Sequence, residues 1–311
     1  MKIVIMGSGA VGAYVGARLY SAGADVTFIA RGEHLQAMQA NGLSIQMPGK
    51  DLKLPQVKAT ADPSSIGYAD LVIFAVKLTD TVTAAQLIKP LVTENTRILT
   101  LQNGIDSLSM ISNELPDAKL RGGVIYVSAV IDSPGVIRSP GGFHRVVADS
   151  ANDDAVMREL GDWGAKSSAL EVALVEDIDR IIWEKFMGLA AFSGCTTLLR
   201  ASAGEIFGNP EATAFMEQLI NESVAVAIAN GKTVRPNIAQ EYLKTLQAAP
   251  PSFRSSMSED LERGKALELS WLSGRIHQLG LQLGVTTPAH TAVYRGLVLK
   301  AQGSSRLQTK A

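Results

Sequence analysis

The N-terminal third of the chain alternates short apolar runs with helical patterns. The apolar runs have the length of buried strands and end at glycine or polar residues, and the intervening segments have helical periodicity. Strands alternating with helices in this way predict βαβ units and a parallel, Rossmann-type α/β sheet. Strands are expected at 2–6 (KIVIM), 25–30 (DVTFIA), 71–77 (LVIFAVK) and 97–104 (RILTLQNG), and helices at 13–23 and 79–89.

The middle of the chain is punctuated by turn residues. A polar stretch with Pro and Gly covers 42–67, and a β-rich segment at 122–148 is expected to close the edge of the first domain. An amphipathic helix is expected at 153–166.

From Asp177 onward the periodicity is helical. We therefore expect two domains, an α/β domain at 1–176 and an all-helical domain at 177–311, with a ligand-binding cleft between them. The polar end, 304–311, is expected to be frayed. Helices are expected at 176–194, at 210–231 (where Asn209-Pro210 begins the helix), at 238–249, within 255–284 and within 287–303.

Composition narrows the class of protein. The 311 residues are 46% hydrophobic and 19% charged with a net charge of −1, which argues against nucleic-acid partners or attraction to anionic membranes. The longest apolar run, 71–76, is far too short to span a membrane. Cys195 is the only cysteine, so a reducing cytoplasm is the expected location. The histidines lack metal-ligand spacing, and no metal site is expected; they are His34, His144, His277 and His290.

A glycine-rich turn directly follows the first predicted strand. Its G-x-G-x-x-G spacing combines a tight turn at Gly7, close approach of backbone to a pyrophosphate at Gly9 and close helix–strand packing at Gly12. The following helix would point its free N–H groups at the phosphates. A purely structural turn is the alternative. The predicted dinucleotide-binding residues are Gly7, Ser8, Gly9, Ala10, Val11 and Gly12.

The residue after the second strand predicts which dinucleotide binds. NAD sites usually have an acidic residue there, whereas this chain has Arg31, which could bind a 2′-phosphate. NADP(H) is therefore the expected cofactor, and a solvated surface charge is the alternative for Arg31. Lys77 and Asn103 follow the next two strands, where ligands bind in open α/β sheets, although ordinary strand-end polarity also explains them.

A lysine on an apolar helical stripe raises a separate question. Lys185 shares its stripe with Ile181 and Leu189, while Arg180 and Glu184 lie on a different stripe that we expect to face solvent. Two explanations are open. The lysine stem could cover apolar surface while its ammonium reaches water, or Lys185 could be a catalytic lysine in a cleft.

Motifs along nearly the whole chain, in this order, resemble the ketopantoate reductase (2-dehydropantoate 2-reductase) family. No single motif is decisive, but their order and spacing are specific. They are GSGAVG at 7–12, Arg31, VK at 76–77, QNG at 102–104, SPG at 133–135, W-x-K at 183–185 and SSMSEDLERGKALEL at 255–269.

The resemblance implies NADPH-dependent reduction of a 2-oxo acid, yielding pantoate for coenzyme A. It implies that Lys185 donates the proton and that Glu268 helps to hold substrate and lysine. Glu268 otherwise lies in a charge-rich helical run, which is usually a solvated face. The resemblance further implies substrate contacts at Ser256 and Asn103 and cofactor contacts at Asn103, Lys77 and the strand end Ser128-Ala129.

The chain departs from the family at two substrate positions. Leu189 and Ser193 stand where the family typically has asparagines, so a bulkier or more apolar 2-oxo acid is a second candidate substrate. A related hydroxy-acid or amino-acid dehydrogenase and a non-catalytic NADP(H) sensor are further alternatives. The helical half could also supply a homodimer surface, with a small 2-oxo acid as the only other expected partner.

Overall fold

The chain forms two compact units, Met1–Asp179 and Arg180–Ala311. The boundary predicted after residue 176 lies close to this division. The predicted fraying of 304–311 lies outside the described residues. The computed structural model describes residues 1–49, 51–141, 144–152, 154–167 and 169–303.

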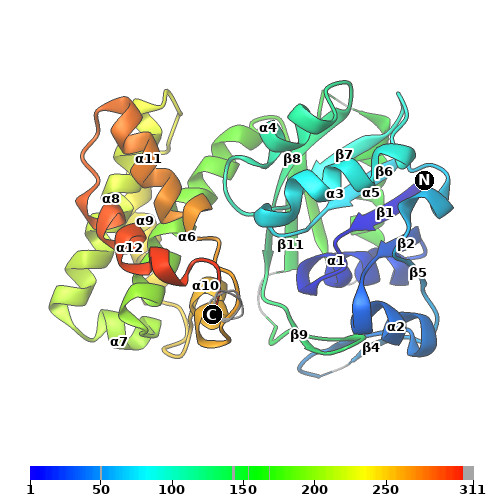
Figure 1. Ribbon diagram of the computed structural model, residues 1–311, viewed down its shortest axis with the longest axis horizontal. Coiled ribbons are helices and arrows are strands. Elements are labelled where there is room, and N and C mark those ends of the chain that lie inside the picture. Colours follow the sequence, from blue (N-terminus) through cyan, green and yellow to red (C-terminus); the bar gives the residue numbers. More distant parts are fainter. Residues whose placement is uncertain (50, 142–143, 153, 168, 304–311) are drawn as a thin grey trace, which may run out of the picture. The chain divides into compact units, whose positions relative to one another are not determined.

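The first unit is built on an eight-stranded sheet (Figure 1). All its neighbouring strands pair in parallel except β8 and β11, which are antiparallel. This confirms the Rossmann-type α/β prediction. In spatial order the strands are β12 (Glu171–Val175), β11 (His144–Asp149), β8 (Lys119–Val127), β7 (Arg97–Thr100), β6 (Leu71–Phe74), β1 (Lys2–Met6), β2 (Asp25–Ile29) and β5 (Lys58–Thr60).

Strand β1 is apolar after Lys2 because both faces of the sheet are covered. Ile3 and Ile5 pack in one buried cluster with residues of α1, whereas Val4 and Met6 pack in a second cluster with residues of α3. The helices of this unit are α1 (Ala10–Ser21), α2 (Gly32–Asn41), α3 (Thr81–Leu87), α4 (Ser107–Glu114) and α5 (Ala155–Lys166), with 3-10 turns η1 (Pro63–Ile66), η2 (Leu78–Asp80) and η3 (Lys89–Leu91).

Several short elements were not predicted. The polar stretch 42–67 contains β5 and, with the segment at 122–148, supplies a second sheet. The segment 122–148, which we expected to close the edge of the domain, forms no edge of the main sheet, whose edges are β12 and β5, but it supplies one edge strand, β9, of the second sheet. Helices α2 and α4 were also missed. The second sheet has the order β4 (Leu52–Leu54), β3 (Leu43–Gln46), β10 (Val136–Arg138) and β9 (Val130–Ser133).

The second unit confirms the all-helical prediction over its described residues. Asn209 caps α8 by accepting hydrogen bonds from two backbone N–H groups, with Pro210 as the first helical residue. No helix in the described part of the chain has the length and apolar character needed to cross a membrane. The helices are α6 (Ile178–Leu199), α7 (Ala203–Phe207), α8 (Pro210–Ala229), α9 (Ile238–Gln247), α10 (Ser256–Glu262), α11 (Ser273–Leu283) and α12 (Pro288–Leu297), with 3-10 turns η4 (Leu269–Trp271) and η5 (Val298–Lys300).

Candidate active site

The glycine-rich turn leaves the carboxyl end of β1 through two positions that only glycine fits. Gly7 has a φ of +94°, and a Cβ on it would lie 2.6 Å from Cγ1 of Val76. A Cβ on Gly12 would lie 2.2 Å from the carbonyl oxygen of Gly7. A larger residue at either position would push the turn away from the sheet.

The same turn offers an open cradle to a ligand. Gly9 occupies the N-cap position of α1, where it has no side chain to bond the first N–H groups of the helix. A Cβ built on it would meet no described atom within 4 Å. The first N–H groups of α1, beginning with Ala10 and Val11, have no partner within the helix. The Ser8 hydroxyl is buried and has no hydrogen-bond partner among the described residues. These features fit the pyrophosphate of a dinucleotide.

Arg31 stands where β2 ends and α2 begins. Its side chain is 75% exposed, and its guanidinium donates to the carboxylate of Asp80 with an Nη2–Oδ2 distance of 3.4 Å. The guanidinium is thus accessible to a phosphate, but it already has an anionic neighbour. Asp80 was not singled out from the sequence, although it lies only three residues beyond Lys77.

A buried glutamine holds together the loops that follow β6 and β7. Gln102 donates from Nε2 to the carbonyl oxygen of Val76 (3.0 Å) and to Oγ1 of Thr81 (2.8 Å). Lys77 lies in the first of these loops and is exposed, and Asn103 lies in the second and is half-buried. Gln102 therefore bonds to residues on either side of Lys77 and directly precedes Asn103. It was noticed only as part of the QNG motif.

Ala129 lies just beyond β8, half-buried. Because β8 pairs in parallel with β7, its carboxyl end reaches the same edge of the sheet as that of β7. The predicted cofactor residues thus gather on one side of the sheet, at the carboxyl ends of β2, β1, β6, β7 and β8. Their role in binding stays a prediction. They are the turn 7–12, Arg31, Lys77, Asn103 and Ala129.

Lys185 and Glu268 are electrostatically coupled within the helical unit. Lys185 projects from α6 and is half-buried, and Glu268 immediately precedes η4 and is also half-buried. Burial lowers the pKa of Lys185 to about 8, and the nearby charge of Glu268 opposes that shift. A snorkelling lysine would keep its ammonium in water, so this desolvated environment favours the alternative of a lysine in a cleft.

The two positions that depart from the family pattern continue the Lys185 stripe along α6. Leu189 is half-buried, whereas Ser193 is 1% exposed and its hydroxyl has no hydrogen-bond partner among the described residues. Ser256 is exposed at the first position of α10, which Ser255 caps by accepting a hydrogen bond from the N–H of Ser258. Ser256 is thus accessible to a substrate, whereas Ser193 is buried.

The expectation that Glu184 faces solvent was wrong. Its side chain is 9% exposed and accepts hydrogen bonds from Nη1 of Arg180 (3.1 Å) and from Nε of Arg235 (3.0 Å to Oε2). The hydroxyl of Tyr242 also donates to the backbone carbonyl of Glu184. Helical periodicity could not reveal this, because Arg235 and Tyr242 come from a distant part of the sequence.

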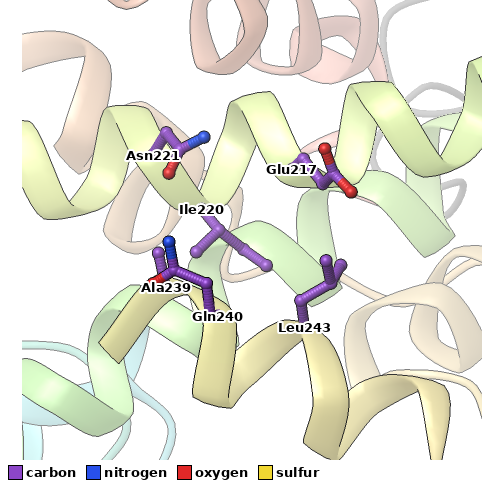
Figure 2. A pocket seen from close by; sticks show the side chains of 6 residues that line it. All are labelled: Glu217, Ile220, Asn221, Ala239, Gln240 and Leu243. Atoms are coloured by element: carbon purple, nitrogen blue, oxygen red, sulfur yellow. The ribbon is translucent and has the colours of Figure 1, made fainter. Parts of the chain in front are cut away.

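A separate pocket of about 170 Å³ lies between α8 and α9. Figure 2 shows side chains of the two helices facing each other across it. None of the predicted substrate-binding residues is among those that line it. Within the described chain, no group of three His, Cys, Asp or Glu side chains could hold a metal ion. The pocket is lined by Glu217, Ile220, Asn221, Ala239, Gln240 and Leu243.

Comparisons with known proteins give consistent matches over both units. Residues 3–152 match the family model "Ketopantoate reductase PanE/ApbA", and residues 177–301 match the model of its C-terminal part. The 2-dehydropantoate 2-reductase of Mesorhizobium japonicum is 28% identical, over 94% of this chain and 95% of its own length.

Solved structures agree with these matches. A PanE/ApbA family ketopantoate reductase from Ralstonia eutropha is 31% identical with a TM-score of 0.89, covering 97% of this chain and 98% of that one. The 2-dehydropantoate 2-reductase of Geobacter metallireducens is 27% identical with a TM-score of 0.88, covering 96% and 99%.

Proposed function

The chain belongs to the ketopantoate reductase family, and from that premise we propose that it reduces a 2-oxo acid to the 2-hydroxy acid with NADPH. The protein is an oxidoreductase of the class that acts on CH–OH groups. The first candidate substrate is 2-dehydropantoate (ketopantoate), whose reduction gives pantoate for pantothenate and coenzyme A biosynthesis. The names of the Mesorhizobium and Ralstonia relatives support this choice.

The observation that carries the proposal is the desolvated, carboxylate-coupled lysine. NADPH, when bound, would supply the hydride that reduces the carbonyl carbon of the substrate. Negative charge then develops on the carbonyl oxygen, and Lys185 donates a proton to it. A pKa of about 8 leaves Lys185 largely protonated at neutral pH and yet close to neutrality, as suits a general acid.

Glu268 has three roles in this scheme. Its negative charge raises the pKa of Lys185 against the effect of burial, so the lysine arrives protonated. Its carboxylate also orients the ammonium and contributes to substrate binding. Asn103 and Ser256 supply hydrogen-bonding groups to the substrate.

The cofactor assignment rests on the edge of the parallel sheet. The turn at 7–12 binds the pyrophosphate, and Arg31 binds the 2′-phosphate that distinguishes NADPH from NADH. Lys77, Asn103 and Ala129 make further contacts. The exposure of the Arg31 guanidinium and the open space over Gly9 support this assignment.

The side chains at positions 189 and 193 favour a second candidate substrate. Leu189 cannot form a hydrogen bond through its side chain, and Ser193 is deeply buried. A site built this way would tolerate a branched or aromatic 2-oxo acid that is more apolar than 2-dehydropantoate.

The remaining expectations concern location and assembly. Cys195 is buried, burial raises the pKa of its thiol to about 12, and it is the chain's only cysteine. These properties fit a reducing compartment, and we place the protein in the cytoplasm. A homodimer stays a prediction.

A substrate panel tests the proposed function. Purified protein is mixed with NADPH or NADH and with 2-dehydropantoate or other branched and aromatic 2-oxo acids, and kcat/KM is compared. Efficient NADPH oxidation with 2-dehydropantoate would support the first candidate. Faster oxidation with another acid would keep the reaction and replace the substrate. Tight NADPH binding without turnover of any acid would favour a non-catalytic sensor.

A further inference from the structure

An ion pair crosses the end of the strand that leads into the glycine-rich turn. Arg31 follows β2 and Asp80 lies beyond the end of β6, and these two strands flank β1 in the sheet. The Nη2–Oδ2 distance between the two side chains is 3.4 Å, although they are 49 residues apart in sequence. The pair therefore joins the two loops on either side of the predicted pyrophosphate site.

The Asp80 carboxylate is not engaged by its own helix. Asp80 occupies the N-cap position of α3, where an aspartate side chain commonly accepts a backbone hydrogen bond, yet it makes no such bond. Arg31 in turn caps α2 without a side-chain hydrogen bond. Both side chains are exposed, at 75% for Arg31 and 51% for Asp80. Their mutual contact is thus the interaction that a bound anion would disturb.

We propose that Asp80 is a specificity-determining residue that lowers the affinity for NADPH by competing with the 2′-phosphate for Arg31. This rests on the proposed function, in which Arg31 binds that phosphate. A phosphate on the guanidinium either displaces the carboxylate or lies beside it and is repelled by its charge. NADH has no 2′-phosphate, so Asp80 does not oppose its binding. Asp80 therefore narrows the preference for NADPH over NADH.

The size of the effect follows from the exposure of the pair. Solvent-exposed ion pairs of this kind shift an equilibrium constant by at most about fivefold. Asp80→Asn keeps the shape of the side chain and removes its charge. We expect this variant to bind NADPH about two- to fivefold more tightly, with no change for NADH.

The experiment compares dissociation constants for NADPH and NADH, measured by cofactor fluorescence, in the full-length protein. The variants are Asp80→Asn, Arg31→Ala and the double variant. The matched control is Asp25→Asn, which breaks an exposed ion pair with Lys58 (2.6 Å) at the opposite end of β2. The control should leave both dissociation constants unchanged.

The outcomes separate this inference from the function on which it rests. Tighter NADPH binding by Asp80→Asn, reduced when Arg31 is absent, supports competition. Unchanged NADPH binding by Asp80→Asn overturns the proposed competition. Weaker NADPH binding also overturns it, because Asp80 would then help binding by orienting Arg31. A gain that persists in full without Arg31 also overturns it. If instead Arg31→Ala leaves the preference for NADPH over NADH unchanged, the role of Arg31 in the proposed function fails.

Discussion

Replacing Glu268 with glutamine should shift the alkaline limit of activity to lower pH. Two opposing effects set the pKa of Lys185 at about 8, because burial lowers it and the charge of Glu268 raises it. Glutamine preserves the shape of the side chain but removes the charge. Burial is then no longer opposed by this residue, and the pKa of Lys185 falls below its wild-type value.

The expected change in rate follows from the protonation of the lysine. A general acid must carry its proton, so activity is lost as the pH rises through the pKa of Lys185. Each unit by which that pKa falls reduces the rate about tenfold, or about 1.4 kcal/mol, at pH values above both pKa values. The variant and the wild type should differ least in acid, where Lys185 is protonated in both.

The assay is the pH profile of kcat/KM for the 2-oxo acid at saturating NADPH, from about pH 6 to pH 10. Glu259→Gln serves as the control, since Glu259 belongs to the same charge-rich segment but pairs with Arg263 on the surface of α10 (3.3 Å). The control should keep the wild-type profile. If Glu268→Gln lowers the rate equally at every pH and keeps the wild-type alkaline limit, the coupling between Glu268 and the catalytic proton is refuted.

Four further substitutions probe the cofactor site and the helical core. Arg31→Ala should weaken NADPH binding by about 1.5–3 kcal/mol and leave NADH binding unchanged, since a charged hydrogen bond is lost; an unchanged NADPH/NADH preference would contradict the assignment. Gly12→Ala places a methyl group 2.2 Å from the carbonyl of Gly7 and should destabilise the fold by about 1–3 kcal/mol, lowering Tm, whereas Gly9→Ala should keep Tm and weaken NADPH binding alone. Burial lowers the pKa of His290 to about 4, below its ordinary 6.5, so the unfolded chain takes up the proton first as the pH falls. The contribution of neutral His290 to stability is therefore fully present only above about pH 6.5. The free energy of unfolding should fall by about 2 kcal/mol between pH 7 and pH 5. His290→Gln should remove that part of the pH dependence in denaturant titrations; an unchanged slope would show that His290 does not cause it.

Local sequence signals were sufficient for the elements that position the cofactor. The apolar run of β1, the glycine spacing that follows it and the helical pattern after Gly12 all lie within a few residues of one another. Such signals predict a strand, a turn and a helix directly. The second sheet was missed because its strands are only three or four residues long, and two of them, β3 and β4, lie in a polar segment. Its pairing partners also come from distant parts of the chain.

The candidate site was predictable to the extent that each residue carries a local signal. Lys185 stands out because it interrupts an apolar helical stripe. Glu268 has no such signal, since it lies among other charged residues, and only the family resemblance identified it. The burial of Glu184 depends on Arg235, which is 51 residues away. The contact of Asp80 with Arg31 likewise depends on strand order, which periodicity does not determine.

The most direct test of the central claim is a comparison of wild type and Lys185→Ala with NADPH already bound. Both proteins are brought to the same NADPH occupancy, mixed with the preferred 2-oxo acid, and NADPH oxidation is followed in a single turnover. Equal NADPH affinity and a rate about 10²–10⁴-fold lower in the variant are the predicted result, because the proton donor is lost while the cofactor site is intact. Near-normal oxidation by Lys185→Ala would exclude Lys185 as the proton donor and contradict the proposed mechanism.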